Sequence, residues 1–183
     1  MKNKSFKYEN LWILTSILIF GVFLRIWISQ FGFNHDFTMW KINLELFSSG
    51  ESFYAYEKYN YSPLWIYILH LLDSIYLNLE NSEHIYRIKI IIFLTLIDIL
   101  IFFCLYKNYS LKIGLLFFLN PITIFITGFH NQFDNLAILL GFLSVLLYEK
   151  NNKDNKIVIP LIILGISLCA KHIMLFFPIW LFL

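Results

Sequence analysis

The stretch from Ile85 to Tyr106 reads IYRIKIIIFLTLIDILIFFCLY and decides the class of fold. Its 22 residues, wound as an α-helix, extend for about 33 Å, which matches the hydrocarbon core of a bilayer. Charged side chains interrupt it only at Arg87, Lys89 and Asp98. An apolar run of this length predicts a membrane-spanning helix, because a soluble domain alternates its apolar and polar residues.

The composition of the whole chain favours the same class of protein. Of its 183 residues, 59% are hydrophobic and 14% are charged, and the formal net charge is +2. These values exclude a disordered chain and a nucleic-acid binder with a basic surface. Cys104 and Cys169 both lie in apolar stretches, which excludes a disulfide-stapled secreted domain. We expect an all-α fold, a multi-pass transmembrane helical bundle, in the cell membrane of a prokaryote or the endoplasmic reticulum of a eukaryote.

The apolar stretches predict the order of the spans within a single membrane domain, residues 1–183. Lysines at the N-terminus precede the first span, and no small-residue cleavage site follows it, so we expect an uncleaved signal anchor. The last apolar run ends in mid-span, so we expect an incomplete domain. The predicted spans cover residues 11–29, 85–106, 111–128, 133–148 and 157–170, and the last run covers residues 173–183.

Two segments between the first two spans, residues 36–47 and 62–78, are expected to be interfacial helices in the first external loop. In the former, Phe37, Trp40 and Leu44 recur with helical spacing and form one apolar face. In the latter, Ser62 and a following proline make a good helix start. Polar residues line one side of this second segment, so its pattern alone also permits a span.

The positive charges decide between these two placements. Short cytoplasmic loops collect Lys and Arg. If residues 62–78 are interfacial, eight Lys and Arg residues face the cytoplasm and five face outward; if they span, the counts are six and seven. The interfacial placement is favoured. It brings residues 35–36, 130–135 and 171–172 to the same, non-cytoplasmic face of the membrane.

The first of these polar clusters is His35 and Asp36, a few residues after the first span. A carboxylate at the membrane surface, shielded by aromatic residues, can act as a general base. It can equally cap a helix that starts at Phe37. The sequence leaves both roles open.

The second cluster lies in residues 120–135, where two spans are joined by a short and very polar connection. His130, Gln132, Asp134 and Asn135 crowd into a connection that needs only a Gly or an Asn. Hydrogen-bonding groups at this density between apolar helices are expected to face water or a ligand. Turn formation and helix capping are the alternative explanation.

Isolated charged residues in the apolar stretches complete the set. Asp98 lies in the middle of a span, where it needs a hydrogen-bonding partner or a cavity. Lys171 and His172 interrupt the last apolar stretch, and they suit either a phosphate group or the membrane interface. We expect Arg25, Arg87 and Lys89 to be interfacial anchors. The spacing of the histidines gives no zinc pattern, and the carboxylates suit only a hard divalent cation such as Mg²⁺ or Mn²⁺.

The order of these motifs resembles a known superfamily. Asp36 is followed by Gly50-Glu51-Ser52-Phe53-Tyr54 and Tyr61-Ser62-Pro63-Leu64, and later by His130-Asn131-Gln132-Phe133-Asp134-Asn135. This arrangement resembles the N-terminal module of the GT-C membrane glycosyltransferases. The last stretch is similar to the His-Phe-Gln-Tyr-Asn motif of dolichyl-phosphate-glucose glucosyltransferases and to the Gly-x-x-Asp-Asn-Glu loop of oligosaccharyltransferase catalytic subunits. Ser62 stands where the pattern has a proline, and Leu136 stands where the loop has its Glu.

The resemblance implies a hexosyltransferase, such as a mannosyl- or glucosyltransferase, with a polyprenyl-phosphate sugar donor and a glycan, lipid or protein acceptor. It implies that Asp36 is the general base and that His130 is a second catalytic residue. The missing Glu puts in doubt the divalent cation (Mg or Mn) of the oligosaccharyltransferase branch. The alternatives are a lipid-linked-sugar carrier or polymerase and a non-catalytic membrane scaffold. The substrate-binding residues implied are His35, Gln132, Asp134, Asn135, Lys171 and His172.

Overall fold

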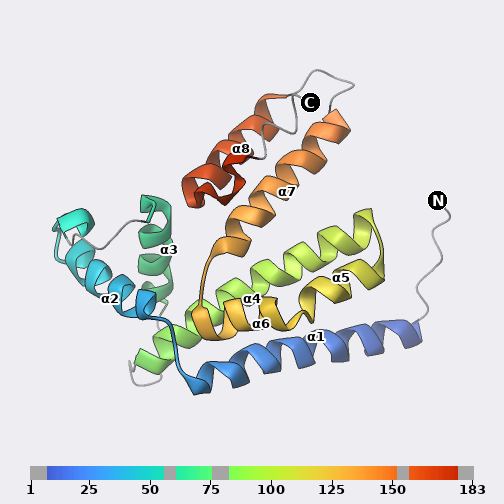
Figure 1. Ribbon diagram of the computed structural model, residues 1–183, viewed down its shortest axis with the longest axis horizontal. Helices are drawn as coiled ribbons and strands as arrows, with labels where there is room; N and C mark the ends of the chain where they lie inside the picture. The colour runs from blue at the N-terminus through green and yellow to red at the C-terminus, as the bar shows by residue number, and fades with distance from the viewer. Residues whose placement is uncertain (1–7, 56–60, 76–82, 152–156, 177–183) are drawn as a thin grey trace.

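A computed structural model describes residues 8–55, 61–75, 83–151 and 157–176, and these residues fold into helices without a strand (Figure 1). Four short helical turns, Ser29–Phe31, Phe53–Ala55, Ile126–His130 and His172–Phe176, connect or extend the main helices. The main helices are α1 (Tyr8–Ile28), α2 (His35–Ser48), α3 (Pro63–Ser74), α4 (Glu83–Asn108), α5 (Leu111–Phe118), α6 (Pro121–Phe125), α7 (Asp134–Asn151) and α8 (Val158–Ala170).

Two of the described helices are long and apolar enough to cross a membrane. They are the first helix, counted over Leu11–Phe31, and α4, and they match the spans predicted at residues 11–29 and 85–106. The segment predicted as one span at residues 111–128 is instead broken into α5 and α6, which bend by 43°. Counting this bent pair as one span gives three.

The break between α5 and α6 has a local cause at Asn120 and Pro121. Proline lacks the amide N–H that would continue the helical ladder, and its ring clashes with the preceding turn. The Asn120 side chain instead accepts a hydrogen bond from the Ile122 amide at 2.9 Å and caps the new helix. The stretch predicted as one span is therefore bent at this proline.

The last two helices pair as an antiparallel hairpin (Figure 1). Two serine hydroxyls tie them together: Ser144 donates to the Pro160 carbonyl, and Ser167 donates to the Ala137 carbonyl, each at 2.7 Å. With 13 residues, α8 is about 20 Å long, which is shorter than the hydrocarbon core of a bilayer. Residues 177–183 of the predicted last run lie outside the described residues.

The short helices α2 and α3 lie beside the start of α4 (Figure 1). The apolar face predicted for residues 36–47 is buried: Phe37, Trp40 and Leu44 pack with Trp65 of α3. Phe133, just before α7, stacks on Trp65 with ring centroids 4.2 Å apart. This aromatic cluster packs α2, α3 and the connection to α7 against one another. The packing holds the neighbouring polar residues in position. Residues 76–78 of the predicted second helix lie outside the described residues.

A polar centre lies buried between the helices, away from solvent. Arg25 of α1 is fully buried and donates from Nε to Asp98 Oδ2 of α4 at 3.0 Å. Asp98 also accepts from the Thr127 hydroxyl at 2.8 Å and from the Asn135 amide at 2.6 Å. The prediction that Arg25 anchors the protein at the interface was therefore wrong. Its partner lies 73 residues away in the sequence, and spacing gives no sign of that pairing.

The other two predicted anchors are also buried. Arg87 is 5% exposed and donates to Asn131 Oδ1 at 2.8 Å and to the Ser29 carbonyl at 2.6 Å. It also donates to the carbonyl of Gly32, so it ties the turn after α1 to the connection before α7. Lys89 is 8% exposed, and its ammonium reaches the Asp73 carbonyl at the end of α3 at 3.5 Å.

Candidate functional site

The polar residues at the ends of α2, α7 and α8 surround one cavity of about 400 Å³. It contains a carboxylate from α2, an amide from the connection before α7 and a cation from just beyond α8. Residues far apart in the sequence therefore meet at one place, as the clustering of polar residues predicts. The lining residues are Asp36, Tyr61, Ser62, Gln132, Leu168, Cys169, Ala170, Lys171 and His172.

Asp36 lies in the first turn of α2, where the N-terminal end of the helix dipole favours a negative charge. The helix begins at His35 with Asn34 as its N-cap, and no side chain caps it. Asp36 instead accepts a hydrogen bond from Asn34 Nδ2 at 3.1 Å and one from Gln132 Nε2. The alternative prediction that Asp36 caps the helix is therefore wrong. The Asp36 side chain instead lines the cavity.

Gln132 connects the negative side of the cavity to its positive side. Its amide nitrogen donates to Asp36, and its Oε1 accepts from Lys171 Nζ at 3.3 Å. Lys171 also forms an ion pair with Asp134. The backbone just before Gln132 makes this possible, because Asn131 adopts the left-handed conformation with φ 59°, which asparagine tolerates better than most residues.

Lys171 is held between an acid and an aromatic ring. Its ammonium lies 5.2 Å from the centre of the buried Phe133 ring, a favourable arrangement for a cation. The Lys171 and Asp134 side chains are 20% and 27% exposed, so their ion pair is open to solvent. A ligand anion has access to this cation without unfolding any helix.

Tyr61 and Ser62 line the cavity but were not among the predicted site residues. Burial raises the pKa of the Tyr61 phenol, and its hydrogen bond with Asp36 raises that pKa further. The phenol therefore keeps its proton and acts as a hydrogen-bond donor to the Asp36 carboxylate. Ser62 caps α3 by accepting from the Leu64 amide at 3.2 Å. Their presence in the Tyr-Ser-Pro-Leu element was the signal in the sequence.

The remaining predicted site residues lie elsewhere. His35 is exposed beside the cavity, and His130 packs its ring against Phe125 at 5.0 Å; neither is among the described residues that line the cavity. Asn135 is buried and donates to Asp98, so it belongs to the sealed centre. His172 does line the cavity, next to Lys171.

The donor set in this cavity does not fit the divalent cation that the family resemblance raises. Among the residues that the structure describes, no three His, Cys, Asp or Glu side chains gather in a way that suits a metal ion. Asp134, the carboxylate that would complete a pair with Asp36, is already neutralised by Lys171. The positive charge at this site is supplied by the protein itself.

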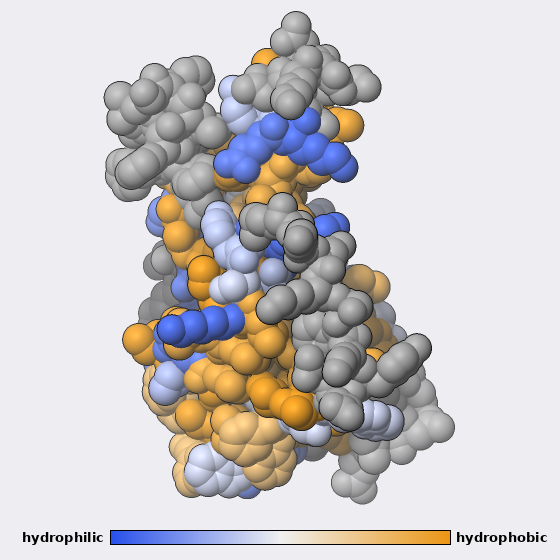
Figure 2. Space-filling view, turned by 90° about the vertical axis from the view of Figure 1, so that its right-hand side faces the viewer, coloured by the Kyte–Doolittle hydropathy of each residue, from blue (hydrophilic) through white to orange (hydrophobic). Residues whose placement is uncertain are grey.

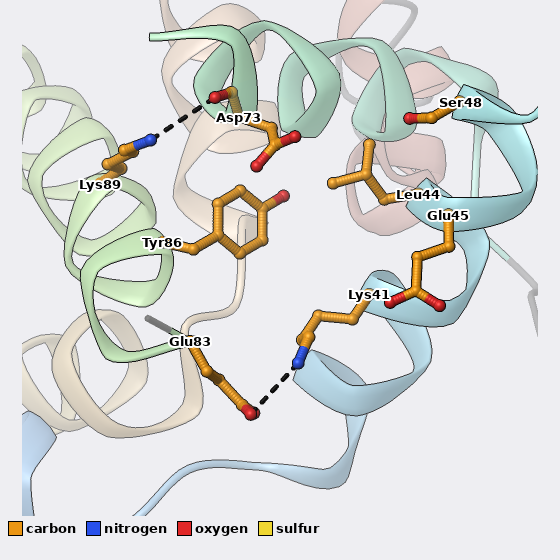
Figure 3. A pocket seen from close by; sticks show the side chains of 8 residues that line it. All are labelled: Lys41, Leu44, Glu45, Ser48, Asp73, Glu83, Tyr86 and Lys89. Atoms are coloured by element: carbon orange, nitrogen blue, oxygen red, sulfur yellow. Dashed lines mark hydrogen bonds and ion pairs between the residues drawn. The ribbon is translucent and has the colours of Figure 1, made fainter. Parts of the chain in front are cut away.

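A second polar cavity, of about 360 Å³, lies between α2, α3 and the start of α4 (Figure 3). Lys41 and Glu83 form an ion pair across it at 3.1 Å. Lys89 reaches the end of α3 from the opposite side, and Tyr86 donates to the Leu69 carbonyl at 3.3 Å. These contacts hold the three helices together. Lys41, Glu83 and Lys89 are thus engaged in contacts between helices.

Comparisons of the chain with protein-family models, with curated proteins and with solved structures found no match.

Proposed function

We propose that this protein is a multi-pass integral membrane glycosyltransferase of GT-C type. It would transfer a hexose from a polyprenyl-phosphate donor to a glycan, lipid or protein acceptor at the non-cytoplasmic face. The observation that carries the proposal is the link from Asp36 through Gln132 to Lys171 around one accessible cavity. Transfer from a sugar phosphate needs a base at one end of the reacting atoms and a cation at the other, and this cavity offers both.

The proposed reaction is a single displacement at the anomeric carbon. The acceptor hydroxyl oxygen forms a bond to that carbon, and the bond from the carbon to the phosphate oxygen breaks. The hydroxyl proton passes to the Asp36 carboxylate, and the electron pair of the broken bond leaves with the polyprenyl phosphate. Lys171 and His172 face the developing charge on that phosphate, since stabilisation there lowers the barrier.

The hydrogen bonds around Asp36 support its assignment as the base. A carboxylate has about four acceptor positions, and the side chains of Asn34, Gln132 and Tyr61 use three of them. The donors among the described residues are fewer than the acceptor positions, so the carboxylate can also accept from an acceptor hydroxyl. The same donors fix the orientation of the carboxylate, which a general base requires.

The membrane placement supports a lipid-linked donor. The two long apolar helices and the bent pair are the candidate spans. The cavity residues come from the start of α2, the connection before α7 and the end of α8. These places lie at the same end of the bundle (Figure 1). A donor with its isoprenoid tail in the bilayer would present its phosphate at this level.

Replacing Asp36 with Asn tests the proposal. Asn keeps the shape of the side chain but removes the base, so we expect transfer from a polyprenyl-phosphate hexose to fall by about 10²–10⁴-fold. The full-length protein, reconstituted in vesicles, is assayed for the glycosidic product. The matched control is Glu45→Gln, which changes a carboxylate on another face of the same helix and leaves transfer unchanged.

Unchanged transfer in Asp36→Asn would overturn the assignment of the base. Movement of the sugar headgroup across the bilayer without a glycosidic bond would favour the lipid-linked-sugar carrier instead. A variant that loses transfer together with its thermal stability would point to a scaffold role for this cluster. Thermal unfolding of both variants is therefore measured beside the activity.

A further inference from the structure

A groove of about 700 Å³ lies between α4 and α7 at the end of the bundle opposite the candidate site. The two helices run in the same direction in Figure 1 and separate toward their C-terminal ends. They pack through a buried cluster that includes Ile97 and Ile101, in the second half of α4, and Leu139, in the first half of α7. On the same part of α4, Leu100 and Phe103 are 51% and 44% exposed.

The residues that line this groove form two matching stripes. On α4, Leu100, Phe103, Cys104 and Lys107 occupy positions i, i+3, i+4 and i+7. On α7 the positions i, i+3, i+4 and i+7 are Leu143, Leu146, Leu147 and Lys150. Each stripe is apolar for two helical turns and then ends in a lysine. Both lysines line the groove and lie in the last turn of their helices.

The two lysines are free to bind an anion. Neither Lys107 nor Lys150 has a carboxylate within 4.0 Å among the described residues, and both are exposed. Glu149 also lines the groove, so its described lining residues carry two positive charges and one negative charge. This end of the molecule shows separate hydrophilic patches on a largely hydrophobic surface (Figure 2).

We propose that this groove binds one phospholipid with a singly charged anionic headgroup. Its acyl chain lies between the apolar stripes, and its phosphodiester lies at Lys107 and Lys150. The net charge of the described lining residues matches a single negative charge. Basic sites between transmembrane helices at the membrane surface are suited to acidic headgroups. The groove is separate from the proposed catalytic cavity, so this inference does not depend on the proposed function.

The natural cysteine in the groove provides the probe. In a Cys169→Ser variant of the full chain, a fluorophore on Cys104 reports on the groove alone. The protein is placed in phosphatidylcholine vesicles that contain equal mole fractions of chain-brominated phosphatidylglycerol or chain-brominated phosphatidylcholine. We expect brominated phosphatidylglycerol to quench the fluorophore more strongly than brominated phosphatidylcholine. Each lysine should raise the local concentration of the anionic lipid by about fivefold. Lys107→Gln together with Lys150→Gln should abolish that preference.

Lys112→Gln is the matched control, because Lys112 is exposed at the same end of the bundle but does not line the groove. It should keep the preference for phosphatidylglycerol. Equal quenching by the two lipids would overturn the proposal, as would an equal loss of preference in Lys112→Gln, which would indicate only the general surface charge. Cross-linking of Cys104 between two copies, with no quenching by either lipid, would assign the groove to self-association and also overturn it.

Discussion

Two ion pairs, each between a basic side chain and an aspartate, lie in very different surroundings in this protein. Arg25 and Asp98 meet at 2.9 Å with both side chains 0% exposed, whereas Lys171 and Asp134 pair with side chains 20% and 27% exposed. The difference separates structural polar groups from those available to a ligand. A sealed pair has no route for a substrate, and an open pair can exchange one partner for a ligand anion.

The hydrogen-bond partners reinforce this difference. Asp98 is surrounded by donors from Arg25, Thr127 and Asn135, all of them protein groups. Asp36 and Lys171 face each other across Gln132 at the edge of an accessible cavity. A buried polar network of the first kind holds helices in register, and one partner cannot be removed without leaving an unpaired charge.

The largest effect is expected from breaking the sealed pair. Arg25→Leu leaves the Asp98 carboxylate buried without its cation, which costs about 3–5 kcal/mol. We expect a large fall in the midpoint of thermal unfolding in detergent. Tryptophan fluorescence measures that unfolding. Arg25→Leu combined with Asp98→Leu should recover much of the loss, because no isolated charge remains. A double variant as unstable as the single one would show that the helix contacts, and not the charge, carry the effect.

A smaller effect is expected at Gly128, which lies where the connection before α7 crosses α1. A Cβ there would meet the Arg25 carbonyl oxygen at 2.5 Å and would also contact Ile28 Cγ2. Since one of these neighbours is backbone, Gly128→Ala must push the two segments apart, at a cost of about 1–3 kcal/mol. Thermal unfolding measures the loss. Gly165→Ala is the control, because a Cβ there meets no atom within 4 Å; equal losses in the two variants would contradict the close approach.

The open side of the comparison was easier to predict from sequence than the sealed side. Clusters of polar residues beside apolar stretches are visible in the sequence, and topology brings Asp36, Gln132 and Lys171 together at one end of the helices. The pairing of Arg25 with Asp98 depends on how two long helices rotate against each other, and an apolar count contains no such information. Gln132 and Asn135 are neighbours in one motif, yet they face different centres because the backbone turns at Asn131.

The helices themselves were predictable where length and composition decide them. The apolar runs that form α1 and α4 are continuous, so burial in a bilayer or in a bundle favours a long helix in each case. At residues 111–128 the local chemistry of one Asn-Pro step overrides the apolar count. Tyr61 could not be assigned to the site from its own position, since its contact with Asp36 arises from the packing of α2 against α3.

The smallest effect is expected at the third ion pair, which is the most exposed of the three. Lys41 and Glu83 are 35% and 48% exposed and meet at 3.1 Å across the second polar cavity. Water screens this pair and competes for both groups, so it contributes only about 0.2–1 kcal/mol. Lys41→Gln should therefore lower the unfolding midpoint slightly, and less at high salt than at low salt. A loss as large as that of Arg25→Leu would break the ranking by exposure, because it would mean that this pair, too, is sealed from water.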